Sequence, residues 1–194
     1  MTATTFYFDL ASPYSYLGAE RVDGLFEDAG LERPTWCPIL FGALLKGLER
    51  KPWGLTDERE RHVAIIEARA ATYGLPPLVW PEPSPANSLA VMRAATVADS
   101  LDQVRPFVLA AYRAAFAEGR DLGDPEVIAA VADAVGLRAE IEAGIAAPET
   151  KARLRAATEE AADAGLEGIP TVAVGPDLFW GDDRLEEAVA AAAR

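Results

Sequence analysis

The sequence predicts an α/β fold in which a long helical segment interrupts a small sheet. Short stretches with alternating or aromatic-rich character, typical of strands, occur near the two ends of the chain, at residues 5–10, 34–40, 171–174 and 178–180. Residues 41–165 instead show apolar side chains at helical spacing. With 194 residues, of which 51% are hydrophobic, the chain is long enough for one domain that carries a large insertion.

The N-terminal part predicts a strand, a helix and a second strand. Residues 5–10 form the first strand, and Ser12 followed by Pro13 is typical of an N-cap and first helical turn. We expect this helix to reach about Ala29, because a glycine follows, and residues 34–40 to form the second strand. Such a unit predicts parallel strands and a right-handed crossover, with its functional end where the first strand meets the helix.

The middle of the chain predicts helices only. The clearest pattern lies in residues 101–118, where seven apolar side chains recur at i, i+3, i+4 and i+7, namely Val104, Phe107, Val108, Ala111, Tyr112, Ala115 and Phe116. Further helices are expected to begin at Asp124-Pro125 and at Pro148. The prolines of residues 76–85 predict an ordered crossing that is not helical.

The C-terminal part returns to strand spacing. Residues 171–180 predict a hairpin, and Asp182 opens a final amphipathic helix. The complete order of elements is that of a thioredoxin-like fold with an all-helical insertion between its second and third strands. We therefore expect a thioredoxin-like domain of residues 1–40 and 166–194, and an inserted helical subdomain of residues 41–165.

Composition argues against several partners. The chain has 18 Lys and Arg against 31 Asp and Glu, a net charge of −13, which would repel nucleic acid and an anionic lipid surface. The N-terminus lacks the pattern of a signal peptide, and no apolar run approaches the roughly 20 residues that span a bilayer. We expect a cytoplasmic protein with no nucleic-acid partner and no membrane partner.

The chain has one cysteine, Cys37, and one histidine, His62. A single cysteine excludes an internal disulfide and a cysteine-based metal cluster, and a single histidine disfavours a zinc site or a Ser-His-Asp arrangement, so we expect no metal. Cys37 lies in a strand-like apolar run and is expected to be a small buried hydrophobe. His62 lies in a charged helix start and is expected to be a solvated surface residue.

Two stretches resemble a known family. Residues 6–18 read FYFDLASPYSYLG, and residues 168–175 read GIPTVAVG, with LFWGDDRLEEA following at 178–188. They are similar to the corresponding parts of kappa-class glutathione transferases and 2-hydroxychromene-2-carboxylate isomerases, which belong to the DsbA-like group of thioredoxin folds. The similarity covers both ends of the chain in the right order, and the helical middle agrees in length and character.

The resemblance implies roles for five residues. Ser12 takes the place of the family's catalytic serine, which donates a hydrogen bond to the thiolate of bound glutathione at the start of a helix. Ile169 and Pro170 form a cis-proline turn whose backbone, at Ile169, pairs with the cysteinyl part of glutathione. Asp182 and Asp183 bind its γ-glutamyl end. From the residues alone, a helix N-cap worth about 1 kcal/mol explains Ser12 better than a catalytic role, and Asp182 is likewise explained as a cap.

The sequence departs from the family in the loop that holds the glycine end of glutathione. Residues 49–63 read ERKPWGLTDERERHV, in which Lys51 and Trp53 partly match, whereas the expected lysine is replaced and Arg59 or Arg61 could substitute for it. Trp53 is assigned to the cofactor site on this match. The acid at position 182 also departs from the usual uncharged residue. The cofactor is therefore expected to be glutathione or another low-molecular-weight thiol.

The resemblance predicts a thiol-dependent isomerase or transferase that acts on a small aromatic compound such as 2-hydroxychromene-2-carboxylate and forms a homodimer. The bound thiolate would be the nucleophile. Tyr14, Trp53 and Trp80 are candidates for an aromatic wall around the substrate, Tyr14 and Trp80 being assigned to substrate binding. A DsbA-type disulfide oxidoreductase is disfavoured, because Ser12 and Ser15 stand where its two cysteines would be. A non-redox binding protein of the same family is the remaining alternative.

Overall fold

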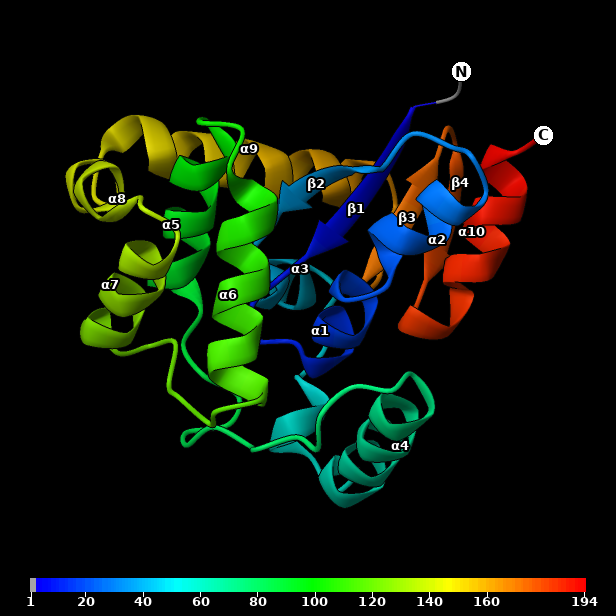
Figure 1. The fold of residues 1–194 in the computed structure, drawn as a ribbon, viewed down its shortest axis with the longest axis horizontal. Helices are drawn as coiled ribbons and strands as arrows, with labels where there is room; N and C mark the ends of the chain where they lie inside the picture. Colours follow the sequence, from blue (N-terminus) through cyan, green and yellow to red (C-terminus); the bar gives the residue numbers. More distant parts are fainter. Residues whose placement is uncertain (1–2) are drawn as a thin grey trace.

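The computed structural model describes residues 3–194, in which four strands form one mixed sheet (Figure 1). The strands are β1 (Thr4–Phe8), β2 (Thr35–Pro38), β3 (Thr171–Val174) and β4 (Asp177–Trp180). Their order is β2-β1-β3-β4, with β1 parallel to β2 and antiparallel to β3, and β3 antiparallel to β4. The predicted thioredoxin-like sheet is confirmed.

Helices make up most of the remainder. They are α1 (Pro13–Ala19), α2 (Val22–Asp28), α3 (Phe41–Gly47), α4 (Arg59–Thr72), α5 (Leu89–Asp99), α6 (Val104–Phe116), α7 (Pro125–Ala134), α8 (Arg138–Gly144), α9 (Pro148–Asp163) and α10 (Leu185–Ala192), with short 3-10 helices η1 (Trp53–Leu55) and η2 (Asp182–Arg184). Residues 41–165, all of them described, contain no strand, so the all-helical insertion is confirmed. That they form a separate subdomain stays a prediction.

The predicted helix from Ser12 to about Ala29 is in fact two helices, α1 and α2. The break falls at Glu20 and Arg21, where the Arg21 N–H donates to the carbonyl of Gly18 rather than four residues back. The break turns the Arg21 side chain toward the C-terminal end of the chain, where it donates to the Asp182 carbonyl at 2.9 Å. The final helix also differs, because η2 covers the residues expected to begin it.

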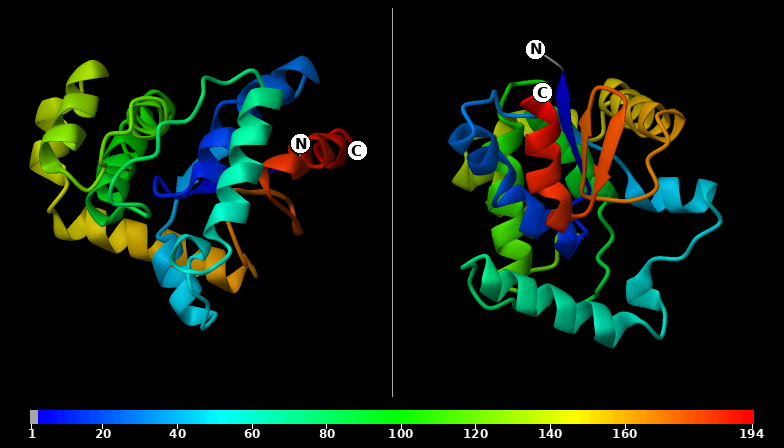
Figure 2. Two further views of the ribbon diagram at one scale, coloured as in Figure 1. Left: turned by 90° about the horizontal axis from the view of Figure 1, so that it is seen from below. Right: turned by 90° about the vertical axis from the view of Figure 1, so that its right-hand side faces the viewer.

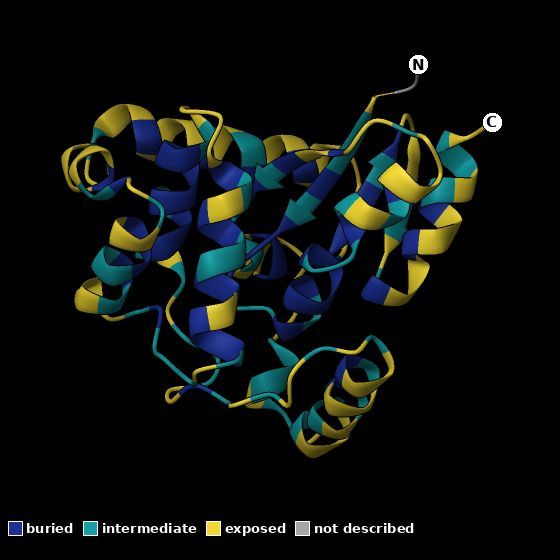
Figure 3. Cartoon of the chain, in the orientation of Figure 1, coloured by how far each residue is buried: buried dark blue, intermediate teal, exposed yellow. Residues whose placement is uncertain are grey.

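Helices cover both faces of the sheet. Helix α10 packs on β3 and against α2 on one side, while α9 packs against β2 with α3 beside it on the other, as the right-hand view of Figure 2 shows. Helices α5 to α8 form a bundle beyond the β2 edge of the sheet (Figure 1). Helix α4 packs against α1 on the side away from the sheet, and much of its surface is exposed (Figure 3). Within residues 3–194 no helix is long and apolar enough to cross a membrane.

An aromatic core joins the sheet to the helical bundle. The ring of Phe8 on β1 lies 5.8 Å from that of Trp36 on β2 and 6.5 Å from that of Tyr112 on α6, and all three side chains are buried. Edge-to-face contacts at these separations stabilise a core beyond the area they bury. The Tyr112 hydroxyl also donates to the Asp9 carbonyl at 3.0 Å, so α6 fixes the chain where β1 ends.

The loop before β3 lies against α1. The Ile169-Pro170 peptide is cis, as the family resemblance implies, and the pairing of Tyr7 with Thr171 brings this loop beside the end of β1. A Cβ atom on Gly18 would come within 3.2 Å of the Pro170 ring, so a glycine at this position allows α1 to approach the loop closely. The start of α1 and the cis-proline loop therefore share one end of the sheet.

Candidate active site

Ser12 lies between β1 and α1, at the N-cap of the helix. Its N–H donates to the Asp9 carbonyl at 3.0 Å, and its Oγ accepts a hydrogen bond from the Ser15 N–H at 3.2 Å, while Pro13 occupies the first helical position. A hydroxyl that accepts through its oxygen keeps its own proton for donation. Ser12 can therefore cap α1 and donate a hydrogen bond to a ligand at the same time.

Two cavities meet at Ser12. One has a volume of about 520 Å³ and the other about 160 Å³, and we call them the larger cavity and the smaller pocket. Their shared wall comes from the start of α1, from α3 and from the loop that leads into η1, and consists of Ser12, Phe41, Leu45, Pro52 and Trp53. A group bound against this wall, in either cavity, would thus lie beside Ser12.

The larger cavity collects most of the residues that the sequence predicts as site residues. Its lining includes Ser12, Tyr14, Trp53, Ile169, Asp182 and Asp183. Pro170 is buried behind Ile169, against α1. Side chains from both ends of the chain and from the helical segment therefore converge on one cavity.

Cations also line the larger cavity. They are Arg50, Lys51 and Arg69, of which Arg50 donates to the Glu167 carbonyl at 2.8 Å. Lys51 is exposed and forms no ion pair with any residue in the range 3–194. Arg59 and Arg61, which the sequence offers as substitutes for the family's lysine, are not part of the lining. The positive charge comes instead from residues on either side of them.

Asp182 and Asp183 are both held by Arg69. The Arg69 guanidinium donates to Asp182 at 2.6 Å and to Asp183 at 2.7 Å, and the Tyr73 hydroxyl donates to the second oxygen of Asp182 at 2.9 Å. The Asp182 side chain is completely buried, whereas that of Asp183 is half exposed. Burial raises the pKa of Asp182, and the charge and hydrogen bonds of its two partners oppose that shift. Asp182 thus anchors α4 to η2, a role that its sequence position did not indicate.

The expectation of a solvated surface position for His62 is wrong. Its ring stacks on Trp53 at 4.8 Å between centroids, its Nδ1 shares a hydrogen bond of 2.7 Å with the Tyr14 hydroxyl, and it lines the larger cavity. Glu58, one turn earlier on the chain, lies 4.0 Å from Nε2. The side chain is 27% exposed. Tyr14, Trp53 and His62 therefore form one aromatic cluster in the wall of the larger cavity, which Phe41 and Trp180 also line.

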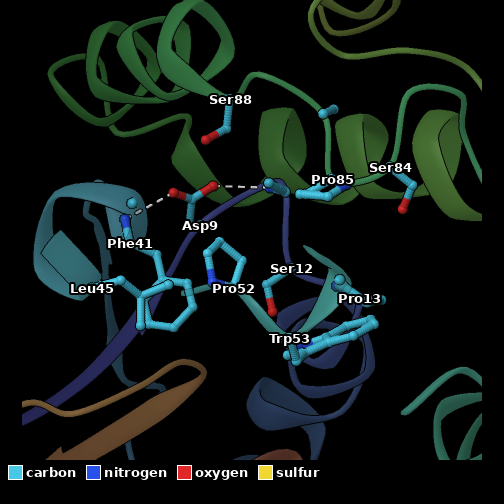
Figure 4. Close-up of a pocket in the computed structure, with 14 residues that line it drawn as sticks. Asp9, Ser12, Pro13, Phe41, Leu45, Pro52, Trp53, Ser84, Pro85 and Ser88 are labelled. Carbon is cyan, nitrogen blue, oxygen red and sulfur yellow. Dashed lines mark hydrogen bonds between the residues drawn. The ribbon is translucent and has the colours of Figure 1, made fainter. Parts of the chain in front are cut away.

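The smaller pocket has a more apolar lining than the larger cavity. Phe41, Leu45, Pro52, Trp53 and Pro85 provide apolar surface, and Ser12, Ser84 and Ser88 provide hydroxyl groups (Figure 4). Asp9 lies at its inner end and is the one ionisable side chain of the lining. The pocket is therefore apolar with a few hydroxyl groups.

The structure does not bring Trp80 to this site. Its indole N–H donates to Glu67 at 2.9 Å and its ring packs edge-on against Phe116, and it lines neither the larger cavity nor the smaller pocket. The expectation that Trp80 forms part of the aromatic wall is not supported. The proline-rich loop directs this side chain to α4 and α6 instead.

The cysteine of the chain lies outside both cavities. Cys37, on β2, lines neither cavity, and burial together with the negative charges of Asp99 and Glu160 raises its pKa to about 12. Ser15, where a second cysteine of a redox pair would stand, is fully buried. Within residues 3–194 no group of three or more His, Cys, Asp or Glu side chains is placed to hold a metal ion. The site therefore presents a hydroxyl, Ser12, and no thiol.

Comparison with known proteins shows the family of the chain. The family model described as a DSBA-like thioredoxin domain matches residues 4–192. The chain is 31% identical to a 2-hydroxychromene-2-carboxylate isomerase of Sphingobium xenophagum, over 96% of each chain, and 27% identical to glutathione S-transferase kappa 1 of Homo sapiens, over 93% of this chain and 86% of that one. A solved structure of a 2-hydroxychromene-2-carboxylate isomerase superimposes with a TM-score of 0.87 at 25% identity, covering 97% of this chain and 93% of the other.

Proposed function

The chain belongs to the DsbA-like thioredoxin-domain family, among the relatives named as 2-hydroxychromene-2-carboxylate isomerases and kappa glutathione transferase, and we propose that it is a thiol-dependent isomerase or transferase. The names of these relatives support glutathione-related enzyme activity at the level of the family. The specific proposal is that glutathione, or another small thiol, binds in the larger cavity and attacks a small aromatic electrophile held beside it. The model substrate is the chromene carboxylate named for the relatives.

The observation that carries this proposal is the position of Ser12. Its oxygen is already engaged with the Ser15 N–H, so its proton is available, and it lies where the larger cavity and the smaller pocket meet. The free N–H groups at the start of α1 add positive potential at the same place. A hydrogen bond to a charged group is worth about 1.5 to 3 kcal/mol.

The remainder of the larger cavity suits a thiol that carries charged groups. Ile169, at the cis-proline loop, offers its backbone to the cysteinyl part, and Lys51 and Arg50, in the loop before η1, supply positive charge for a carboxylate. The half-exposed Asp183 can take an ammonium group, although Arg69 already holds one of its oxygens. That competition would weaken the binding of a γ-glutamyl amine and leaves room for a thiol of different structure.

The reaction follows from where the two ligands would lie. The thiolate adds to an electrophilic carbon of the substrate, and for an isomerisation the adduct rearranges and expels the thiolate again, so the thiol is regenerated. In a transferase the sulfur–carbon bond is kept. In both, Ser12 lowers the pKa of the ligand's thiol and orients the sulfur at the shared wall.

Thermal shift measurements test the proposal. Glutathione at about 100 times its dissociation constant stabilises the folded chain by about 2.7 kcal/mol, which raises the Tm by roughly 5 to 10 °C for a chain of this size. A glutathione analogue with a methyl group in place of the thiol is the control and should give a smaller shift. If neither glutathione nor any other biological thiol raises the Tm, the enzyme proposal fails and the non-redox binding protein replaces it.

The cytoplasmic location and the homodimer implied by the resemblance stay predictions. Sedimentation equilibrium of the purified chain tests the dimer directly, and a mass of one chain at micromolar concentration would contradict it.

A further inference from the structure

The smaller pocket contains no cation. Its ionisable side chain is Asp9, which is 2% exposed and forms no ion pair with any residue that the structure describes. The two oxygens of Asp9 accept hydrogen bonds from the backbone N–H groups of Ala11 and Phe41, each at 2.9 Å (Figure 4). An acid held by uncharged donors thus lies at the inner end of an apolar pocket.

The cations of the site all line the larger cavity. Arg50, Lys51 and Arg69 lie there, with two of the three engaged by carbonyl or carboxylate oxygens of the protein. A carboxylate placed in the smaller pocket would lose its hydration, gain no counter-charge and face Asp9. An uncharged compound would meet none of these three unfavourable effects.

The volume of the smaller pocket limits what it can hold. An apolar cavity of about 150 Å³ is large enough to bind benzene, and the smaller pocket has about 160 Å³. One aromatic ring therefore fits inside it. A second ring or a reactive double bond would project past Phe41 and Trp53 to the shared wall, where Ser12 lies.

We propose that the smaller pocket binds the electrophilic substrate by one aromatic ring and selects an uncharged compound over its carboxylate-bearing counterpart. The ring packs against the apolar lining of the pocket, inside Phe41 and Trp53, and a hydroxyl or carbonyl group on it meets the hydroxyl of Ser84. This assignment rests on the proposed thiol-dependent function. It narrows the substrate class to neutral aromatic electrophiles, so an uncharged counterpart replaces the chromene carboxylate that served as the model substrate of the proposed function.

Binding of a matched ligand pair tests the selectivity. Coumarin and coumarin-3-carboxylate differ by one carboxylate, and their affinities are measured by quenching of tryptophan fluorescence, with and without the methyl analogue of glutathione that fills the larger cavity. We expect coumarin to bind at least tenfold more tightly under both conditions. Equal or tighter binding of the carboxylate, with the analogue present, overturns the inference.

A variant that adds a cation to the smaller pocket gives the converse test. Ser84 lines the pocket, and Ser84→Arg should improve binding of coumarin-3-carboxylate by about tenfold, whereas Ser84→Gln, which adds similar bulk without charge, should not. If the two variants bind the carboxylate equally, the pocket's charge does not determine its selectivity and the inference fails.

The same measurements separate this inference from the proposed function. A thermal shift by glutathione together with preferred binding of the carboxylate would leave the thiol-dependent function standing and overturn the neutral-substrate assignment. Preferred binding of coumarin without any thermal shift by a thiol would support the assignment of the pocket while the enzyme proposal fails.

Discussion

The larger cavity and the smaller pocket share a wall but differ in charge. Arginine, lysine, aspartate and glutamate side chains line the larger cavity, whereas the smaller pocket has apolar side chains, serine hydroxyls and one buried acid. A thiol such as glutathione carries several charged groups, whereas an aromatic electrophile can be uncharged. The difference teaches that one hydroxyl, Ser12, lies at the boundary between a charged cavity and an apolar pocket, which is the position that the proposed function requires of it.

The largest expected effect is the slow reaction of the chain's one thiol, Cys37, which lines neither cavity. Cys37 lies on β2, and because burial and nearby acids raise its pKa to about 12, three units above the ordinary value of 9.0, its thiolate population near pH 8 falls about 1,000-fold. We expect Ellman's reagent to modify Cys37 far more slowly in the folded chain than in denaturant. Cys37 is only partly buried, not the fully buried hydrophobe that its strand-like context predicted, and comparable rates in the two states would contradict its raised pKa and allow the chain a nucleophile of its own.

Removing Arg69 should damage the larger cavity and the stability of the fold together. Arg69→Ala leaves the buried carboxylate of Asp182 with Tyr73 as its remaining partner, which should cost about 2 to 3 kcal/mol and lower the Tm by roughly 5 to 10 °C. Arg61→Ala, on the exposed face of the same helix, is the control and should change the Tm by less than about 2 °C. Equal Tm values for the two variants would show that Arg69 does not anchor α4 to η2.

The shared wall is tested by comparing two tryptophans. Trp53 lines both cavities, so Trp53→Ala should weaken the binding of glutathione and of coumarin by about tenfold each, through the loss of packing area and of aromatic contacts. Trp80→Ala removes a ring that lines neither cavity and should leave both affinities unchanged. Isothermal titration calorimetry measures both, and loss of one ligand's binding alone in Trp53→Ala would mean that the wall is not shared.

The fold follows from local signals in the sequence. The strand patterns at residues 5–10 and 171–180 and the Ser12-Pro13 cap depend on neighbouring residues alone, and the family resemblance supplies the order in which they pair. The break between α1 and α2 was not predicted, and it accompanies a contact of Arg21 with Asp182, 161 positions away, that no local pattern indicates.

The site was predicted less completely for the same physical reason. Ser12, Ile169 and Asp183 were recognised in motifs, whereas Arg69 and His62 lie in a helix that resembles any charged surface helix. Only the packing of that helix against α1 and η1 places them in the larger cavity. Trp80 was misplaced because a proline-rich loop gives no local indication of which way an aromatic ring will turn.

The pKa of the bound thiol tests the account most directly. Thiolate absorbance of glutathione bound to the wild-type chain is titrated against pH beside Ser12→Ala and Ser12→Thr, the latter keeping a hydroxyl. Losing one hydrogen bond to the thiolate, worth at least about 1.5 kcal/mol, should raise the pKa of the bound thiol in Ser12→Ala by about one unit, and Ser12→Thr should restore most of the shift. If glutathione bound to wild type and to Ser12→Ala titrates at the same pH, Ser12 does not hold the thiolate and the central claim is contradicted.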